Sequence, residues 1–149
     1  MASEFDKLEE EIMADMWSAY TKTVIDHAMN PRNVGSIADA KGFGRVTGPC
    51  GDTMKIWLRV RNGTIAQATF WTDGCGTSIA AGSMVTELAE GVTAIEALRI
   101  TQQEVLDALG GLPEESVHCA VLAANTLREA VRDYLTTRKE PWKRAYRRC

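Results

Sequence analysis

Three of the four cysteines in the chain have neighbours that could take part in metal or sulfur chemistry. Cys50 is followed two residues later by Asp52, in the segment TGPCGDTMK. Cys75 lies between two glycines, and Cys119 directly follows His118. Soft thiolates combined with an imidazole and a carboxylate favour zinc or iron-sulfur chemistry over magnesium or calcium. These residues are therefore the candidate ligands of one shared site.

Each of these residues also has an ordinary structural interpretation. A single cysteine is commonly a small buried apolar residue, and Asp52 follows a glycine in a pair that is typical of turns. His118 taken alone is typical of a surface or hydrogen-bonded histidine. The cysteine positions taken together with their acidic and imidazole neighbours favour the shared site. Cys149 ends the charged C-terminal segment and is interpreted as a free thiol with no assigned role.

The composition predicts one domain over residues 1–149, with an acidic extension at 1–14 and a basic tail at 138–149. The chain has 149 residues, of which 45% are hydrophobic and 25% are charged. This length suits one core and is too short for two typical domains. No apolar run is long enough to cross a bilayer, so we expect a cytoplasmic protein without a membrane partner. Free thiols or metal ligands are then favoured over disulfides. The net charge of -3 gives no overall attraction to nucleic acid.

The sequence predicts that a helix and a small sheet position the first of these residues. Apolar residues at helical spacing predict a helix over 15–30, which ends before Pro31 because proline disfavours helical geometry in the residue preceding it. A glycine-rich segment with a short strand at about 44–48 then leads to Cys50.

A hairpin follows Cys50. The segment MKIWLRVR at 54–61 alternates apolar and polar residues, which predicts a half-buried strand with Trp57 on the face opposite the apolar stripe. A single exposed aromatic residue is common there, with a partner contact as the less favoured interpretation. The pair Asn62-Gly63 is a strong hairpin-turn signal, and TIAQATFWT at 64–72 supplies the returning strand. The sequence therefore predicts a small antiparallel sheet of about three strands.

Helical patterns follow the sheet. The segment at 77–90 is a predicted helix with Gly91 as its stop, and its N-terminus would stabilise a thiolate at Cys75. A longer helix runs from Pro113 to Leu135 and carries His118 and Cys119 in its opening turns. Two capping-box signatures open short helices between them: Thr93 with Glu96, and Thr101 with Glu104. This order predicts an α+β fold with the helices packed on one face of the sheet.

Four segments resemble the iron-sulfur cluster assembly scaffolds of the IscU and NifU N-terminal type. They are DHAMNPRNVGS, GPCGDTMKIWLRV, FWTDGCGTSIAAGSMVTEL and VHCAVLAANTLREAV, and together they span about residues 25–135. The resemblance implies a small helix-and-sheet domain with its site at one end. It also implies that Cys50, Cys75 and Cys119 hold the cluster, with Asp52 or His118 as the fourth ligand.

The resemblance implies a scaffold rather than an enzyme. Sulfur from a cysteine desulfurase of the IscS or NifS type and ferrous iron would be built into a transient 2Fe-2S cluster and passed to apo iron-sulfur acceptor proteins. In that account Cys119 accepts persulfide sulfur and Asp52 modulates cluster release. A permanent centre takes four thiolates, whereas three thiolates with an exchangeable oxygen or nitrogen ligand leave one coordination position more weakly bound. Without iron, the same residues suit a tetrahedral zinc site.

The chain departs from the family pattern before the His-Cys pair. A Leu-Pro-Pro-Val-Lys segment read by a dedicated Hsp70-type chaperone is usual there, whereas this chain has LPEESVHC. The change argues against recognition by such a chaperone.

Two alternative functions remain open. One is a zinc-dependent sulfurtransferase of the SufU type, and the other is a zinc-stabilised structural domain that binds a partner through its basic tail. The SufU branch carries a longer insertion between its second and third cysteines and lacks the histidine. The short spacing from Cys75 to Cys119 and the presence of His118 therefore favour the scaffold.

Overall fold

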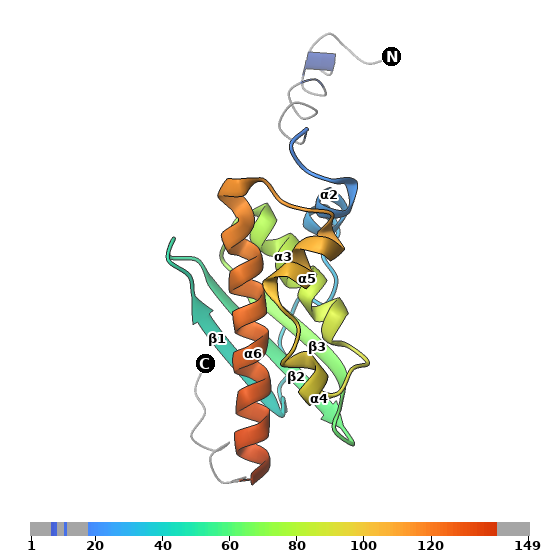
Figure 1. The fold of residues 1–149 in the computed structure, drawn as a ribbon, viewed down its shortest axis with the longest axis vertical. Helices are drawn as coiled ribbons and strands as arrows, with labels where there is room; N and C mark the ends of the chain where they lie inside the picture. The colour runs from blue at the N-terminus through green and yellow to red at the C-terminus, as the bar shows by residue number, and fades with distance from the viewer. Residues whose placement is uncertain (1–6, 9–10, 12–17, 140–149) are drawn as a thin grey trace.

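The computed structural model describes residues 7–8, 11 and 18–139 of the chain. Three strands form one antiparallel sheet in the order β1-β2-β3. They are β1 (Gly42–Thr47), β2 (Thr53–Arg61) and β3 (Thr64–Thr72). The helical elements are α2 (Lys22–Met29), α3 (Gly76–Ala89), α4 (Ala94–Ala97), α5 (Gln102–Leu109), the 3-10 turn η1 (Glu114–Ser116) and α6 (Val117–Lys139). Figure 1 shows the long helix α6 running across the sheet, and the predicted α+β fold is confirmed.

The predicted hairpin joins β2 to β3. Asn62 and Gly63 have positive φ angles of 52° and 78°, as a two-residue hairpin turn of this kind requires. The apolar stripe of β2 is fully buried, with Met54, Ile56 and Leu58 each 0% exposed. This stripe packs into one core with apolar residues of α3 and α6, so the helices cover this face of the sheet.

Two glycines allow α3 and α6 to lie directly on the sheet. A Cβ atom added at Gly44 of β1 would lie 2.5 Å from the backbone nitrogen of Ala130 and 2.6 Å from the carbonyl oxygen of Thr126, both in α6. A Cβ atom added at Gly82 of α3 would lie 2.5 Å from the ring of Phe70 in β3. Only glycine permits such close approaches. The close packing of both helices on the sheet therefore depends on these two glycines.

The opposite face of the sheet carries a second, smaller core. Trp57 is only 9% exposed, and its ring centroid lies 5.4 Å from that of Phe43. Ile37 and Ala40 complete this cluster, because residues 33–41 fold over the outer face of the sheet. The prediction that Trp57 is exposed is wrong, since alternation along one strand does not reveal a loop that returns from elsewhere to cover it.

Three predicted helix boundaries differ from the structure. The first helix begins at Lys22, because the Thr21 hydroxyl accepts a hydrogen bond from the backbone N–H of Val24 at 3.1 Å. Residues 18–20 form a turn and a bend instead of helix. The helix predicted at 77–90 spans Gly76–Ala89, and the last helix begins at Val117, after the 3-10 turn that follows Pro113.

Both predicted capping signatures open helices. Thr93 and Glu96 form a complete capping box at the start of α4. The Thr101 hydroxyl accepts a hydrogen bond from the backbone N–H of Glu104 at the start of α5, at 3.3 Å. These short helices are therefore specified locally, as the sequence predicts.

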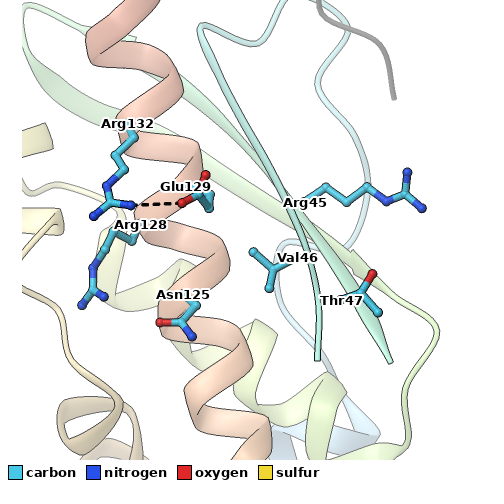
Figure 2. A pocket seen from close by; sticks show the side chains of 7 residues that line it. All are labelled: Arg45, Val46, Thr47, Asn125, Arg128, Glu129 and Arg132. Carbon is cyan, nitrogen blue, oxygen red and sulfur yellow. Dashed lines mark hydrogen bonds and ion pairs between the residues drawn. The ribbon is translucent and has the colours of Figure 1, made fainter. Parts of the chain in front are cut away.

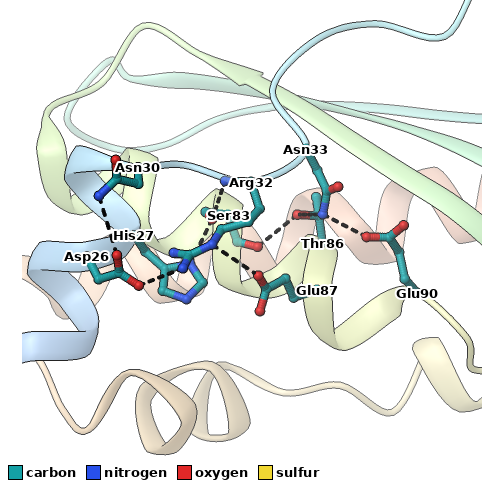
Figure 3. A network of polar contacts seen from close by, with 9 residues as sticks. All are labelled: Asp26, His27, Asn30, Arg32, Asn33, Ser83, Thr86, Glu87 and Glu90. Carbon is teal, nitrogen blue, oxygen red and sulfur yellow. Dashed lines mark hydrogen bonds and ion pairs between the residues drawn. The ribbon is translucent and has the colours of Figure 1, made fainter.

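A polar network ties the segment after α2 to the outer side of α3 (Figure 3). The Nδ1 atom of buried His27 lies 2.7 Å from the Ser83 hydroxyl, which also accepts a hydrogen bond from the backbone N–H of Arg32 at 2.9 Å. The Arg32 guanidinium pairs with Asp26 at 2.6 Å and with Glu87 at 3.5 Å. The segment NPRN is therefore part of the α2-α3 contact.

Within the described part of the chain, none of the helices combines the length and apolar character needed to cross a membrane. The predicted acidic extension at 1–14 lies outside the described residues except for 7–8 and 11, and the basic tail except for 138–139. Cys149 also lies outside them.

Candidate functional site

The candidate site residues belong to three segments at one end of the molecule. Because both strand pairs are antiparallel, the β1-β2 loop and the residues after β3 leave the sheet at the same end. The first turn of α6 reaches that end as well (Figure 1). The loop carries Cys50 and Asp52, the β3-α3 junction carries Cys75, and α6 begins with Val117, His118 and Cys119.

The β1-β2 loop is a tight turn with Cys50 exposed at its tip. The backbone N–H of Gly48 donates to the carbonyl oxygen of Asp52 at 2.8 Å, and the N–H of Gly51 donates to the carbonyl oxygen of Gly48 at 3.0 Å. Gly51 has a φ of 89°, which favours glycine over other residues. The thiol of Cys50 is exposed to solvent.

Side-chain caps fix the β3-α3 junction to the start of β2. The backbone N–H of Thr53 donates to Asp73 Oδ1 at 2.8 Å, and the N–H of Gly74 donates to the hydroxyl of Thr72 at 3.1 Å. Cys75 then takes the N-cap position of α3, with an extended backbone. Its thiol therefore stands at the positive end of a helix of 14 residues.

Asp52 reaches this junction from the neighbouring loop. A Cβ atom added at Gly74 would lie 3.1 Å from Asp52 Oδ2 and 2.5 Å from the hydroxyl oxygen of Ser78. The absence of a side chain at Gly74 thus leaves room for the carboxylate and the hydroxyl beside the residue that precedes Cys75.

Two hydroxyl groups contact the sulfurs of Cys75 and Cys119, and that of Thr77 lies between them. Thr77 Oγ1 lies 3.0 Å from Cys75 Sγ and 3.4 Å from Cys119 Sγ. Ser78 Oγ lies 3.4 Å from Cys119 Sγ. The Nε2 atom of His118 lies 3.7 Å from the same sulfur. The structure thus brings Cys75, His118 and Cys119 into one cluster, next to Asp52.

The two thiols of this cluster have opposite pKa shifts. Partial burial raises the pKa of Cys75, but hydrogen bonds from the Thr77 hydroxyl and from the start of α3 outweigh it, so this pKa is lowered. Cys119 is 0% exposed, and burial raises its pKa despite the hydroxyls of Ser78 and Thr77. Thiolate formation at neutral pH therefore favours Cys75 over Cys119.

Cys50 does not take part in the contacts that join the other candidates. Among the described residues, no three His, Cys, Asp or Glu side chains are arranged to hold a metal ion. The donor types nevertheless suit an iron-sulfur cluster or zinc.

Thr77 and Ser78 were not predicted as site residues. In the sequence, the pair Thr-Ser after CG has the composition of a helix start, and nothing marks it as a contact of the distant Cys119. Only the packing of α3 against α6 brings these hydroxyls to the Cys119 sulfur.

A separate groove of about 500 Å³ lies between β1 and α6. Three arginines, Arg45, Arg128 and Arg132, are among its lining residues, and Arg132 pairs with Glu129 at 3.2 Å. Figure 2 shows that the Arg45 side chain points away from α6, so the guanidinium groups do not converge on one point. None of the candidate ligands lines this groove.

Residues 19–141 match the family described as the NifU-like N terminal domain. "Iron-sulfur cluster assembly scaffold protein IscU 1" of Archaeoglobus fulgidus is 51% identical over 116 residues, which cover 77% of this chain and 76% of that protein. The protein named as the IscU scaffold of Escherichia coli is 41% identical over 126 residues, which cover 81% of this chain and 98% of that protein.

Solved structures share the fold at lower identity. A NifU-like protein (N-terminal) from Brucella abortus superposes with a TM-score of 0.63 at 20% identity, over 81% of this chain and 97% of that one. A putative scaffold protein for the SUF system from Fervidobacterium islandicum gives a TM-score of 0.61 at 19% identity, over 77% of this chain and 98% of that one. The resemblance found in the sequence is confirmed: the chain belongs to the NifU-like N-terminal domain family, together with IscU-type proteins that match most of its length.

Proposed function

We propose that this chain is an iron-sulfur cluster assembly scaffold that builds a transient 2Fe-2S cluster and transfers it to apo-proteins. The observation that carries the proposal is the sharing of the Thr77 hydroxyl by the sulfurs of Cys75 and Cys119, beside His118 and near Asp52. Support comes from relatives that are named as scaffolds and match most of the chain.

In this proposal the cluster is cargo, and three cysteines hold it. Cys75 and Cys119 supply two sulfur ligands from neighbouring helices, and the β1-β2 loop supplies Cys50 when the cluster forms. Asp52 or His118 completes the set with an oxygen or nitrogen ligand, which binds iron more weakly than a fourth thiolate would. The same donors suit zinc when iron is absent.

We assign sulfur acceptance to Cys119. Its thiolate attacks the outer sulfur of a persulfide on a cysteine desulfurase, a new S–S bond forms at Cys119, and the desulfurase cysteine leaves as a thiolate. Each transferred sulfur then takes up two electrons to become sulfide, one from a ferrous ion and one from an external thiol or ferredoxin-type donor. Because Cys119 is 0% exposed and burial raises its pKa, the first turn of α6 must open before this step, which exposes the sulfur and removes the burial that disfavours its thiolate.

The proposed role requires partners but no substrate turnover by the chain itself. A cysteine desulfurase supplies sulfur, and apo iron-sulfur proteins receive the cluster. The segment LPEESVHC departs from the usual chaperone-binding segment, so a dedicated Hsp70-type chaperone is not included. We assign this activity to the cytoplasm.

Anaerobic reconstitution tests the proposal. The protein is incubated with ferrous iron, cysteine, a thiol reductant and a catalytic amount of cysteine desulfurase, and visible absorbance is followed. We expect a 2Fe-2S chromophore that transfers to an apo-ferredoxin.

Two cysteine variants serve as a matched pair. Cys119→Ser should lose sulfur acceptance, measured as mass added to the protein, whereas Cys149→Ser should behave as the unmodified chain. Retention of sulfur acceptance and cluster formation by Cys119→Ser would show that Cys119 is not the acceptor. Absence of the chromophore, with strong desulfurase stimulation by the zinc-bound protein, would instead support a zinc-dependent sulfurtransferase.

A further inference from the structure

Two hydroxyl groups of α3 are buried against cysteine sulfur. Thr77 is 5% exposed and Ser78 is 0% exposed, yet the partners of their side chains are Cys75 and Cys119. Sulfur is a weaker hydrogen-bond acceptor than a carbonyl oxygen. Burying a hydroxyl against sulfur therefore stabilises the fold less than burying it against the main chain.

Three other buried hydroxyls in the helices make the stronger kind of contact. They donate to carbonyl oxygens three or four residues earlier in the same helix: Thr86 to Ser83 at 2.8 Å, Thr126 to Leu122 at 2.7 Å, and Thr137 to Asp133 at 2.9 Å. Thr77 and Ser78 differ in that they point at the sulfurs of a candidate site. Thr77 and Ser78 lie in the first turn of α3, where the carbonyl groups three and four residues earlier precede the helix, so their hydroxyls are available to the sulfurs.

We propose that Thr77 and Ser78 are positioning residues that hold the Cys75 and Cys119 sulfurs and donate hydrogen bonds to them while they bind the cluster. This inference rests on the proposed scaffold function. Hydrogen bonds to cluster sulfurs withdraw electron density and stabilise the reduced, more negative cluster, which raises its reduction potential.

The arrangement gives the site two unequal sides. Cys75, which is exposed, and Cys119, which is buried, both have hydroxyl contacts from α3, whereas Cys50 lies exposed on a loop and takes no part in these contacts. The cysteines with hydroxyl contacts form the side that retains iron. The loop with Cys50 and Asp52 forms the side from which the cluster leaves.

The test uses variants that separate the hydroxyl from the side-chain volume. Thr77→Val removes the hydroxyl with little change in size, and Thr77→Ser retains it. Thr86→Val is the matched control, because Thr86 is a 0% exposed threonine of the same helix whose hydroxyl bonds to a carbonyl oxygen instead of sulfur. The midpoint potential of the cluster and its rate of loss to a chelator are measured for each variant.

We expect Thr77→Val to shift the midpoint potential to a more negative value and to increase cluster loss several-fold. Thr77→Ser should match the unmodified chain in both quantities, and Thr86→Val should change only the free energy of unfolding. Equal potentials for Thr77→Val and the unmodified chain, or an equal shift in Thr86→Val, would overturn the inference. If Thr77→Val does not fold, Ser78→Ala carries the same test at the Cys119 sulfur.

Cobalt(II) binding to the cluster-free protein provides a second readout. Loss of a hydrogen bond to thiolate sulfur should move the thiolate-to-cobalt charge-transfer band to lower energy in Thr77→Val and leave it in place in Thr77→Ser. If the unmodified chain binds cobalt but forms no cluster, the scaffold proposal fails, and the cobalt band alone then decides the role of Thr77. An unmoved band would overturn that role.

Discussion

The carboxylate of Asp52 lies against the main chain of Gly74, since a Cβ atom added at Gly74 would be 3.1 Å from Asp52 Oδ2. The contact joins the loop that carries Cys50 to the junction that carries Cys75. Asp52 is therefore a neighbour of two candidate cysteines, and it is placed to influence a bound cluster from the β1-β2 loop.

Replacing Asp52 by alanine should make the assembled cluster longer-lived, by roughly tenfold on the scale typical of residues that tune metal sites. The reason is that the variant lacks the oxygen that we propose assists release. The decay of visible absorbance in the presence of a chelator measures the lifetime. Asp39→Ala, at an exposed acid in a loop outside the site, should leave the lifetime unchanged. A shorter or unchanged lifetime in Asp52→Ala would contradict this role.

Replacing Gly74 by alanine should destabilise the protein by about 1–3 kcal/mol, the usual cost of forcing an extra methyl group into a packed region. The added Cβ atom would lie 2.5 Å from Ser78 Oγ, closer than such contacts allow. Urea denaturation measures the free energy of unfolding. Gly48→Ala is the control, because the nearest atom to its Cβ would be 3.7 Å away, and it should change stability by less than about 0.5 kcal/mol. Equal stability of the two variants would show that the Gly74 region is not tightly packed.

Replacing Gly44 by alanine should lower the free energy of unfolding by about 3 kcal/mol or more, because the three nearest atoms that its Cβ would meet all belong to the main chain of α6 and cannot rotate away. The helix would have to move off β1, and Cys119 at its start would move with it. The free energy of unfolding, measured by urea denaturation, and the yield of cluster should therefore both decrease in this variant. Normal stability would contradict the close contact between β1 and α6.

The free energy of unfolding should decrease as the pH falls below the ordinary histidine pKa of 6.5. Burial lowers the pKa of His27, the nearby Arg32 guanidinium lowers it further, and the carboxylates of Glu87 and Asp26 oppose the shift (Figure 3). Below pH 6.5 the unfolded chain binds a proton at His27 more readily than the folded chain does. The stabilisation that comes from neutral His27 is therefore complete above pH 6.5 and decreases progressively as the pH falls towards the lowered pKa. The loss should not exceed about 1.4 kcal/mol per pH unit.

Urea denaturation at several pH values between neutral and mildly acidic measures this effect. His27→Gln retains a polar group for the Ser83 hydroxyl and cannot titrate, so its stability should depend less on pH than that of the unmodified chain. Parallel pH dependence in the two proteins would assign the effect to other groups.

The sequence predicted most of the fold because the signals involved are local. Alternation in β2, the Asn62-Gly63 turn and the Thr93-Glu96 capping box each act within a few residues. The burial of Trp57 could not be predicted in this way, because residues 33–41 cover it from outside the strand and the resulting contacts have no period along the chain.

The site was only partly predictable for a similar reason. The types and neighbours of Cys75, His118 and Cys119 marked them as candidates, and the structure groups them beside Asp52. Thr77 and Ser78 have no comparable signal, since hydroxyl residues at a helix start are common. Their role depends on a contact between α3 and α6, which are separated along the chain by residues 90–116.

The close contact of α6 with β1 has a consequence for access to the buried sulfur. Gly42 and Gly44 of β1 meet α6 at residues 126–134, whereas Cys119 is in the first turn of the same helix. A partner can therefore reach the thiol by unwinding one turn at 117–119 while the rest of the helix stays on the sheet. In the proposed function, the Cys119 sulfur is then presented by a local opening that costs less free energy than global unfolding, so the domain would stay folded through each sulfur transfer.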